Sequence, residues 1–261
     1  MTLPAAVSLP GWRLSNAVPS VRMPENDARP ELSVVLAAHN EEEMLRSTVE
    51  EIVGELQAHG VAFEIVVVEN GSVDATAALA DSLADEHPEV RALHETTADY
   101  GRALRRGLLS SRGGIVVNFD VDYYDVGFLA AASELIRMGR ADIVVGTKRG
   151  PGSQDERAIG RRIVTAGFAL VLRVGFGLRA SDTHGMKAVD RARLAPLAER
   201  CELGTDLFDT ELVLRAERAG FVVAELPVRV VELRPARSSI IRRVARTPGG
   251  LVRLYRALGR R

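Results

Sequence analysis

The chain alternates between short apolar runs and longer segments with helical periodicity. The apolar runs are rich in β-branched residues, which is typical of strands buried on both faces. They comprise residues 32–38, 63–68, 115–119 and 143–145, with a weaker strand signal at 90–93. The segments with helical periodicity comprise residues 42–58, 75–83, 101–111 and 127–138. This alternation predicts one α/β domain with a mostly parallel sheet, helices on both faces and right-handed crossovers.

Polar side chains follow three of the predicted strands at the point where each strand ends. These groups are His39-Asn40-Glu41, Glu69-Asn70-Gly71-Ser72 and Asp120-Val121-Asp122. In open parallel sheets, ligands bind beyond the carboxyl ends of the strands. The pattern therefore predicts a binding site along this edge.

Asp120 and Asp122 are the sharpest chemical signal at that edge. They end an apolar strand, where two carboxylates are costly to bury without a cation or hydrogen-bond donors. Two hard oxygen ligands one residue apart suit Mg²⁺ or Mn²⁺ bound jointly with substrate phosphates. The alternative is a pair of strand-end acids that face water. The strand context and the other acids on the edge favour the metal.

Glu69 is the second candidate. A well-capped turn accounts for Gly71, Ser72 and Asp74, because glycine adopts positive φ and the other two side chains cap a following helix. It does not account for an acid at the end of an apolar run. A carboxylate there can accept hydrogen bonds from a nucleobase or a ribose.

The rest of the chain divides into three regions. Residues 1–30 hold several prolines without a signal-peptide pattern, and we predict a flexible leader there. The domain spans 31–233, and its second half adds a helix at 155–174, a polar loop at 181–187, a helix at 206–219 and an extended segment at 221–231. We expect that half to build the acceptor side.

Residues 234–261 form a basic tail with nine arginines and no acid. Its apolar residues have helical spacing, which we expect to be interrupted at Pro248-Gly249-Gly250, and such basic amphipathic segments are typical of membrane-surface binding. The alternative is a helix packed on the domain. Tyr255 is its one aromatic residue, which argues against nucleic acid as the partner.

Bulk composition narrows the class of protein. The 34 basic residues nearly cancel the 35 acidic ones, so net charge argues neither for nor against a nucleic-acid partner. Cys201 is alone, so no intrachain disulfide forms, which fits a reducing cytoplasm. The most apolar stretch, 163–178, is shorter than a bilayer span of roughly 20 residues and carries Arg173. We therefore predict a cytoplasmic protein that binds the membrane peripherally, at its cytoplasmic face.

Seven segments together resemble a known family. They are SVVLAAHNEEEML, EIVVVENGSVDAT, YGRALRRGL, VVNFDVDYYD, DIVVGTKR, SDTHGMKAV and FDTELVLRAERAGFVVAELPVRV, in this order. They resemble the inverting GT-A glycosyltransferases of family 2, above all the dolichol-phosphate mannose synthase-like branch, which glycosylates polyprenyl phosphates. The resemblance covers about Leu32 to Val231.

The resemblance implies a role for each matching residue. It places the nucleotide at Ala37, His39, Glu41, Glu69, Gly101 and Arg102. It places the metal at Asp120 and Asp122, of which Asp122 is also catalytic. It places a phosphate group at Lys148 and Arg149. Because Arg157, Arg161 and Arg162 follow closely, they are candidates for the lipid phosphate, and the alternative for each of them is a solvated helix face. The resemblance places the acceptor beside His184 and Lys187, with Asp209 or Glu211 as general base in relatives that use hydroxyl acceptors.

Two positions depart from the family pattern. Glu69-Asn70 replaces the common pair of aspartates, which leaves the base open. Tyr124 stands where the synthases often have a glutamine metal ligand, so that ligand is either missing or replaced by Asp125.

The resemblance implies an inverting glycosyltransferase that moves a sugar from a UDP- or GDP-sugar to a polyprenyl phosphate with Mg²⁺ or Mn²⁺. Two alternatives stay open: a sugar or small-molecule hydroxyl as acceptor, with an acidic base, and a non-catalytic nucleotide-binding relative. A sugar nucleotidyltransferase fits less well. Such enzymes open with a Gly-rich, basic loop after the first strand, where this chain has Ala37-Ala38-His39-Asn40-Glu41.

Overall fold

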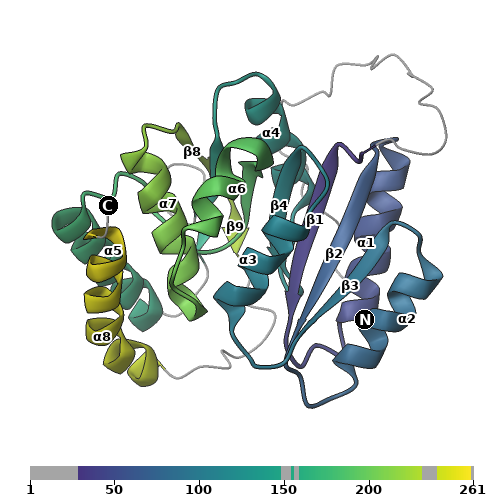
Figure 1. Cartoon of the computed structure of the whole chain (residues 1–261), viewed down its shortest axis with the longest axis horizontal. Coiled ribbons are helices and arrows are strands. Elements are labelled where there is room, and N and C mark those ends of the chain that lie inside the picture. Colours follow the sequence, from purple (N-terminus) through teal and green to yellow (C-terminus); the bar gives the residue numbers. More distant parts are fainter. Residues whose placement is uncertain (1–28, 148–153, 156–158, 231–239, 260–261) are drawn as a thin grey trace.

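The computed structural model describes residues 29–147, 154–155, 159–230 and 240–259. The predicted leader lies outside the described residues except for Arg29 and Pro30. The described chain forms a seven-stranded sheet with helices on both faces (Figure 1). The predicted α/β class and mostly parallel sheet are confirmed.

The sheet has the strand order β3-β2-β1-β4-β7-β5-β8. Its strands are β1 (Leu32–Ala38), β2 (Phe63–Asn70), β3 (Val90–Glu95), β4 (Ile115–Asp120), β5 (Ile143–Thr147), β7 (Lys187–Asp190) and β8 (Val223–Pro227). Strand β7 runs antiparallel to β4 and β5, and the other pairs are parallel. The short strands β6 (Gln154–Asp155) and β9 (Arg229–Val230) form a separate parallel pair.

The helices cover both faces of this sheet. They are α1 (Leu45–Ala58), α2 (Thr76–Glu86), α3 (Tyr100–Ser110), α4 (Val126–Arg137), α5 (Ile159–Phe176), α6 (Arg191–Glu199), α7 (Phe208–Arg218) and α8 (Ile240–Gly259), with a 3₁₀ turn at Thr205–Leu207. Figure 1 shows α3 and α6 in front of the sheet and α1 behind it, while α5 and α8 lie side by side at one end.

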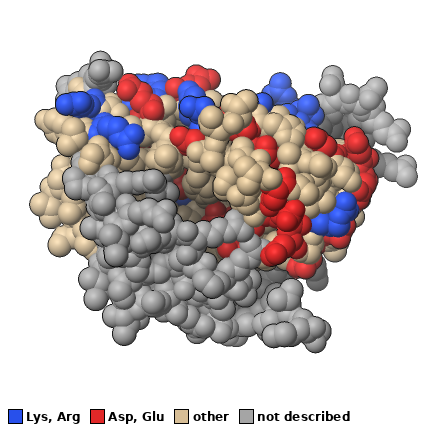
Figure 2. Space-filling view, turned by 90° about the horizontal axis from the view of Figure 1, so that it is seen from below, with Lys and Arg blue, Asp and Glu red and all other residues tan. Residues whose placement is uncertain are grey.

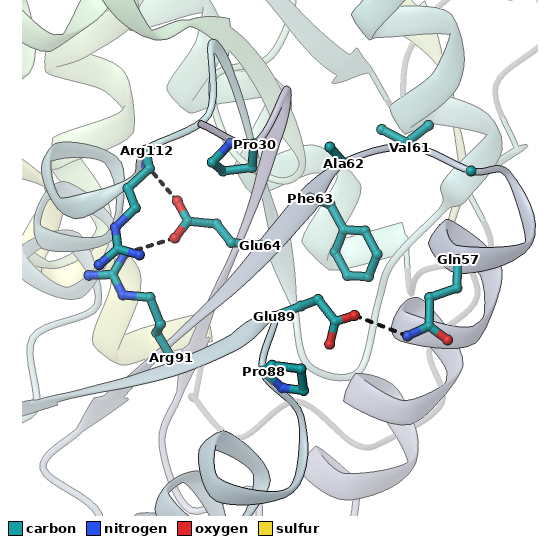
Figure 3. A pocket seen from close by; sticks show the side chains of 11 residues that line it. Pro30, Gln57, Val61, Ala62, Phe63, Glu64, Pro88, Glu89, Arg91 and Arg112 are labelled. Atoms are coloured by element: carbon teal, nitrogen blue, oxygen red, sulfur yellow. Dashed lines mark hydrogen bonds and ion pairs between the residues drawn. The ribbon is translucent and has the colours of Figure 1, made fainter. Parts of the chain in front are cut away.

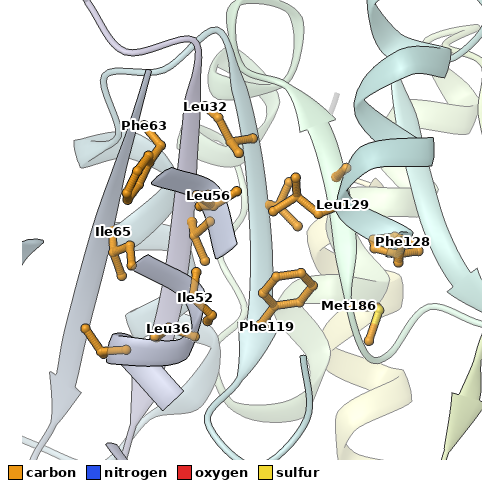
Figure 4. Packing of buried hydrophobic residues seen from close by; sticks show 14 of the residues in the cluster. Leu32, Leu36, Ile52, Leu56, Phe63, Ile65, Phe119, Phe128, Leu129 and Met186 are labelled. Carbon is orange, nitrogen blue, oxygen red and sulfur yellow. The ribbon is translucent and has the colours of Figure 1, made fainter. Parts of the chain in front are cut away.

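The central strands are apolar on both faces because both faces are covered. Val34 and Leu36 of β1 pack in one core, which also holds Ile52 of α1 and Phe119 of β4 (Figure 4). Val35, between them, points into a second core under α3 and α7. Alternate residues of a strand thus fill opposite cores.

The C-terminal helix differs from the sequence-based expectation. Helix α8 is continuous through Pro248-Gly249-Gly250, so the predicted interruption is wrong. A Cβ on Gly250 would lie 2.9 Å from Leu207 Cδ1, so glycine allows a close approach there. Leu254 is buried against a third core that includes Leu172 of α5. This packing outweighs the poor helix propensity of the three residues.

Candidate active site

The ends of β1, β2 and β4 meet at one edge of the sheet. Ala37 lies opposite Asp120, and Ala38 lies opposite Glu69. The strand register therefore brings the predicted nucleotide and metal residues to one rim, as the sequence suggested. Figure 2, viewed from below in Figure 1, shows acidic side chains gathered over much of one half of the molecule.

Asp120 ends β4 and Asp122 lies in the tight turn that follows it, and both side chains are half-buried. The Tyr100 hydroxyl donates a hydrogen bond to Asp120 Oδ1 at 2.7 Å. The buried Thr48 hydroxyl donates to the Val121 carbonyl oxygen at 2.8 Å, which ties the turn to α1. The two carboxylates are thus held on a fixed backbone, and as hard oxygen donors they fit a divalent cation.

The residues after this pair have other partners. The Tyr124 hydroxyl bonds to Glu51, and burial raises its pKa, with Glu51 contributing further. Asp125 Oδ1 accepts from the Phe128 backbone nitrogen at 2.9 Å and caps α4. The structure thus gives each of these side chains a role outside the metal site that we predict at Asp120 and Asp122.

A second group of possible metal ligands lies between α1 and the end of α2. It consists of Glu50, Glu86 and His87, and it is the one cluster of this kind found among the described residues. Arg46 Nη1 already lies 3.2 Å from Glu50 and 2.6 Å from Glu86. Its hydrogen bond lowers the pKa of Glu86 to about 2. The arginine occupies the place of a cation, so this cluster is not a metal site.

Glu69 is buried at the end of β2. Its Oε1 accepts from the Ser72 backbone nitrogen at 2.5 Å, and its Oε2 lies 3.5 Å from His94 Nδ1. Gly71 lies in the turn between Glu69 and Ser72 and has a φ of 63°. A Cβ at this position would lie 2.8 Å from the Ala98 nitrogen. One oxygen of Glu69 thus closes the turn, and a contact with the base or ribose stays a prediction.

Hydrogen bonds join the loops around the rim. His39 Nδ1 donates to the Asn70 carbonyl oxygen at 2.8 Å, and the Glu41 nitrogen donates to Thr76 Oγ1 at 2.8 Å. Asn70 Oδ1 accepts from the Asp99 nitrogen at 2.7 Å. The predicted nucleotide residues His39 and Glu41 therefore lie in loops that are tied to the turn after β2.

The start of α3 joins the first half of the chain to the second half. Asp99 Oδ1 accepts from the Arg102 nitrogen at 2.9 Å, which caps α3, and from the Thr205 nitrogen at 2.6 Å. A Cβ on Gly101 would lie only 2.6 Å from the Thr205 carbonyl oxygen. A glycine at position 101 therefore allows this close packing. The Arg102 side chain is exposed, and its Nη1 lies 3.4 Å from Thr97 Oγ1.

Tyr100 is a site residue that sequence reasoning missed. It stands directly before Gly101 in the YGRALRRGL segment, so its side chain comes from the first turn of α3. From there it reaches Asp120 across the rim. An aromatic hydroxyl in the first turn of a helix that begins at the rim was the signal available in the sequence.

The acceptor-side residues are paired inside the protein. Lys187 Nζ lies 2.9 Å from Asp209 Oδ2, and both side chains are buried. Glu211 is fully buried, and its Oε1 lies 2.6 Å from Arg215 Nη2. His184 is half-buried, with its ring centroid 6.0 Å from that of Phe168. Among the four predicted acceptor-side residues, Lys187, Asp209 and Glu211 are buried and His184 is partly exposed.

The predicted phosphate-binding cations are only partly covered by the structure. Lys148, Arg149 and Arg157 lie outside the described residues. Arg161 and Arg162 belong to the first turns of α5, where the backbone alone is described. Their role stays a prediction.

An open pocket of about 510 Å³ lies at the opposite end of the strands (Figure 3). Phe63 and Glu64 line it where β2 begins, together with Arg91 and Arg112. Burial raises the pKa of Glu64, but hydrogen bonds from Ser33, Arg112 and Arg91 outweigh it and lower the value. This pocket is remote from Asp120 and holds none of the predicted site residues.

Residues 33–192 match the model of the family described as glycosyl transferase family 2. Glycosyltransferase AglD of Haloferax volcanii is 34% identical over 203 residues, which are 76% of this chain and 32% of that protein. Undecaprenyl-phosphate mannosyltransferase of Micrococcus luteus is 30% identical, and the match covers 76% of this chain and 82% of that protein. A dolichyl-phosphate beta-glucosyltransferase of Drosophila melanogaster is 29% identical over 84% of this chain and 73% of its own.

Solved structures share the fold. Glucosyl-3-phosphoglycerate synthase from Mycobacterium tuberculosis, with Mn²⁺, UDP-glucose and phosphoglyceric acid, superposes with a TM-score of 0.66 at 22% identity. The match covers 88% of this chain and 80% of that one. The same enzyme with Mg²⁺ and UDP gives a TM-score of 0.65 at 22% identity, with the same coverage. In the described part of this chain, no helix combines the length and hydropathy needed to cross a membrane.

Proposed function

Because this chain belongs to glycosyl transferase family 2 and is a glycosyltransferase, we propose that it transfers a sugar from a nucleotide sugar to a polyprenyl phosphate. Transfer inverts the anomeric carbon and depends on a divalent metal. The acceptor class is supported by the relatives, one of which acts on undecaprenyl phosphate and one on dolichyl phosphate.

The donor lies at the rim of β1, β2 and β4. Asp120 and Asp122 would hold Mg²⁺ or Mn²⁺, which would offset the negative charge that builds on the leaving nucleotide. The Tyr100 hydrogen bond orients the Asp120 carboxylate toward this task. We place Ala37, His39, Glu41 and Glu69 around the nucleoside by the family resemblance. A structural neighbour with this fold has been crystallised with UDP-glucose and Mn²⁺ and with UDP and Mg²⁺, which supports a nucleotide-sugar donor and a divalent metal.

An oxygen of the lipid phosphate attacks the anomeric carbon from the face opposite the nucleotide. The new bond joins the anomeric carbon to the phosphate oxygen, and the bond to the nucleotide diphosphate breaks. A phosphate is already ionised at neutral pH, so no side chain has to remove a proton. The cations predicted at Lys148, Arg149, Arg157, Arg161 and Arg162 hold the acceptor through charge-assisted hydrogen bonds.

The observation that carries this choice of acceptor is the pairing of both candidate bases. Asp209 is paired with Lys187 and Glu211 with Arg215, both inside the protein. A hydroxyl acceptor needs a free carboxylate within hydrogen-bond reach. An ionised phosphate acceptor does not, which favours the polyprenyl phosphate.

The paired helices α5 and α8 supply the membrane contact. Val174 of α5 is 80% exposed and Tyr255 of α8 is 71% exposed. Arg173, Arg253 and Arg256 are exposed on the same two helices. Each arginine near an anionic leaflet contributes about 1 kcal/mol of binding free energy. We propose that this face rests on the membrane that carries the acceptor, at its cytoplasmic side.

The test is a transfer assay with undecaprenyl phosphate in vesicles and a panel of UDP- and GDP-sugars. We expect one nucleotide sugar to give a glycolipid with Mn²⁺ or Mg²⁺, no product with chelator, and none from Asp122→Asn. Asp85→Asn, on the exposed side of α2, is the control. Transfer to a free sugar hydroxyl but not to the lipid phosphate would contradict the proposed acceptor.

A further inference from the structure

Lys187 and Asp209 form a buried ion pair next to the rim. Lys187, on β7, is 2% exposed, and Asp209, in the first turn of α7, is 4% exposed. A cavity of about 20 Å³ adjoins the pair, and its other lining residues are apolar except for Asn118. That volume admits about one water molecule. A sugar or a phosphate does not fit there.

Lys187 also closes the turn that precedes β7. Its Nζ donates to the Gly185 carbonyl oxygen at 2.7 Å and to the Thr183 carbonyl oxygen at 3.2 Å. With Asp209, these acceptors satisfy all three hydrogens of the ammonium group. Thr183 Oγ1 lies 2.9 Å from Thr210 Oγ1 of α7, a second link between the turn and the helix.

The direction of β7 places this turn at the active site. Strand β7 is antiparallel to β4, with Lys187 opposite Asn118. The beginning of β7 therefore lies at the edge where β4 ends in Asp120. Asn118 stands two residues before Asp120, and its Nδ2 donates to the Gly185 carbonyl oxygen at 3.3 Å. The turn that carries His184 is thereby fixed beside the predicted metal site.

We propose that the Lys187–Asp209 pair is a positioning device that sets the turn at 183–185 and so presents His184 to the acceptor. Asp209 takes no proton from the acceptor. If it did, the proton would cancel the charge that balances Lys187 and leave a buried ammonium unpaired, which proteins avoid. This inference rests on the proposed function, because only an acceptor that is already ionised dispenses with a base.

The experiment compares Lys187→Met, Asp209→Leu and the double variant with wild type, all as full chains. Each single change leaves one buried charge without its partner, whereas the double change replaces both charges by apolar groups. Arg46→Met with Glu86→Leu, an exposed pair that joins α1 to α2, is the matched control. The readouts are Tm, the imidazole NMR signal of His184, UDP binding with Mn²⁺, and kcat and KM for undecaprenyl phosphate between pH 5 and 9.

We expect each single variant to lower Tm, shift the His184 signal and raise the acceptor KM at least tenfold, with UDP binding changed less than threefold. The double variant should regain most of the Tm and the His184 signal. It should also transfer sugar at least tenfold faster than Asp209→Leu, with the acid limb of its pH profile unchanged. The control variants should match wild type.

Two results would overturn the inference. One is a double variant that is as stable as wild type but as slow as Asp209→Leu, with a loss of 10²–10⁴ in rate, as expected for a missing general base. The other is a His184 signal that none of the variants moves. A wild-type chain that glycosylates no lipid phosphate contradicts the proposed function instead, and the Tm and NMR comparison still decides whether the pair sets the turn.

Discussion

Replacing Glu211 by glutamine separates a structural acid from a catalytic base. Glu211 Oε2 accepts from the nitrogens of Glu202 and Leu203 at 3.0 and 2.8 Å. Its Oε1 accepts from Arg215 Nε and Nη2 at 2.8 and 2.6 Å. Glutamine offers one oxygen, so its amino group must face donors on one of the two sides. The change therefore breaks a buried ion pair and at least one set of hydrogen bonds.

The expected cost follows from those contacts. Breaking a buried pair by removing one charge costs about 3–5 kcal/mol. For a chain of this size each kcal/mol lowers Tm by roughly 2–4 °C, so Glu211→Gln should melt roughly 6–20 °C below wild type. Because Glu211 is fully buried and has no contact with a substrate in our proposal, kcat per folded molecule should fall less than about threefold.

The assay measures Tm by calorimetry and kcat well below the Tm of the variant. Glu217→Gln is the matched control, since Glu217 is a buried acid on the same helix that accepts from the nitrogens of Arg179 and Ala180 at 2.9 Å. It should lose stability without losing rate. A Glu211→Gln protein that keeps its Tm but loses 10²–10⁴ in rate would refute the reasoning and restore Glu211 as the general base.

Four further changes test other parts of the site. Tyr100→Phe removes the hydrogen bond to Asp120 and should weaken Mn²⁺ binding about 10- to 100-fold, measured by calorimetry with UDP present; unchanged affinity contradicts its orienting role. Glu69→Ala should weaken UDP or GDP binding by about 1–3 kcal/mol if a charged hydrogen bond to the nucleoside is lost, and unchanged binding by a folded variant makes Glu69 structural. Gly101→Ala should lower Tm, because its Cβ would lie 2.6 Å from the Thr205 carbonyl oxygen; an unchanged Tm contradicts the tight packing. Arg253→Glu with Arg256→Glu should release the protein from anionic vesicles and leave UDP binding intact, and equal vesicle binding excludes α8 as the contact.

The donor half of the fold follows from local patterns in the sequence. Apolar runs followed by polar groups predict β1, β2 and β4 and the rim around Asp120, because strands covered on both faces are apolar throughout. Even the weak signal of β3 has a physical cause, since it is an edge strand with most side chains only partly buried. The family resemblance then added roles to residues that periodicity had merely located.

The second half of the site depends on contacts that no local pattern encodes. The reversed strand β7 and helix α6 were not predicted, because a four-residue strand carries little periodic signal. The pairing of Lys187 with Asp209 joins residues 22 positions apart and depends on the direction of β7. The continuity of α8 was not predicted, because its packing against Leu207 and α5 outweighs the low helix propensity of its proline and glycines.

The Asp99 carboxylate has a consequence for how such enzymes are recombined. It caps a helix of the donor half and at the same time holds the Thr205 nitrogen of the acceptor half, while a Cβ on Gly204 would lie 2.3 Å from it. Exchanging the acceptor half for that of a relative therefore replaces one side of a tightly fitted joint. A chimera should therefore keep its fold only if Asp99, Gly101 and Gly204 all come from the same parent. The segment exchanged with the acceptor half should include Asp99 and Gly101.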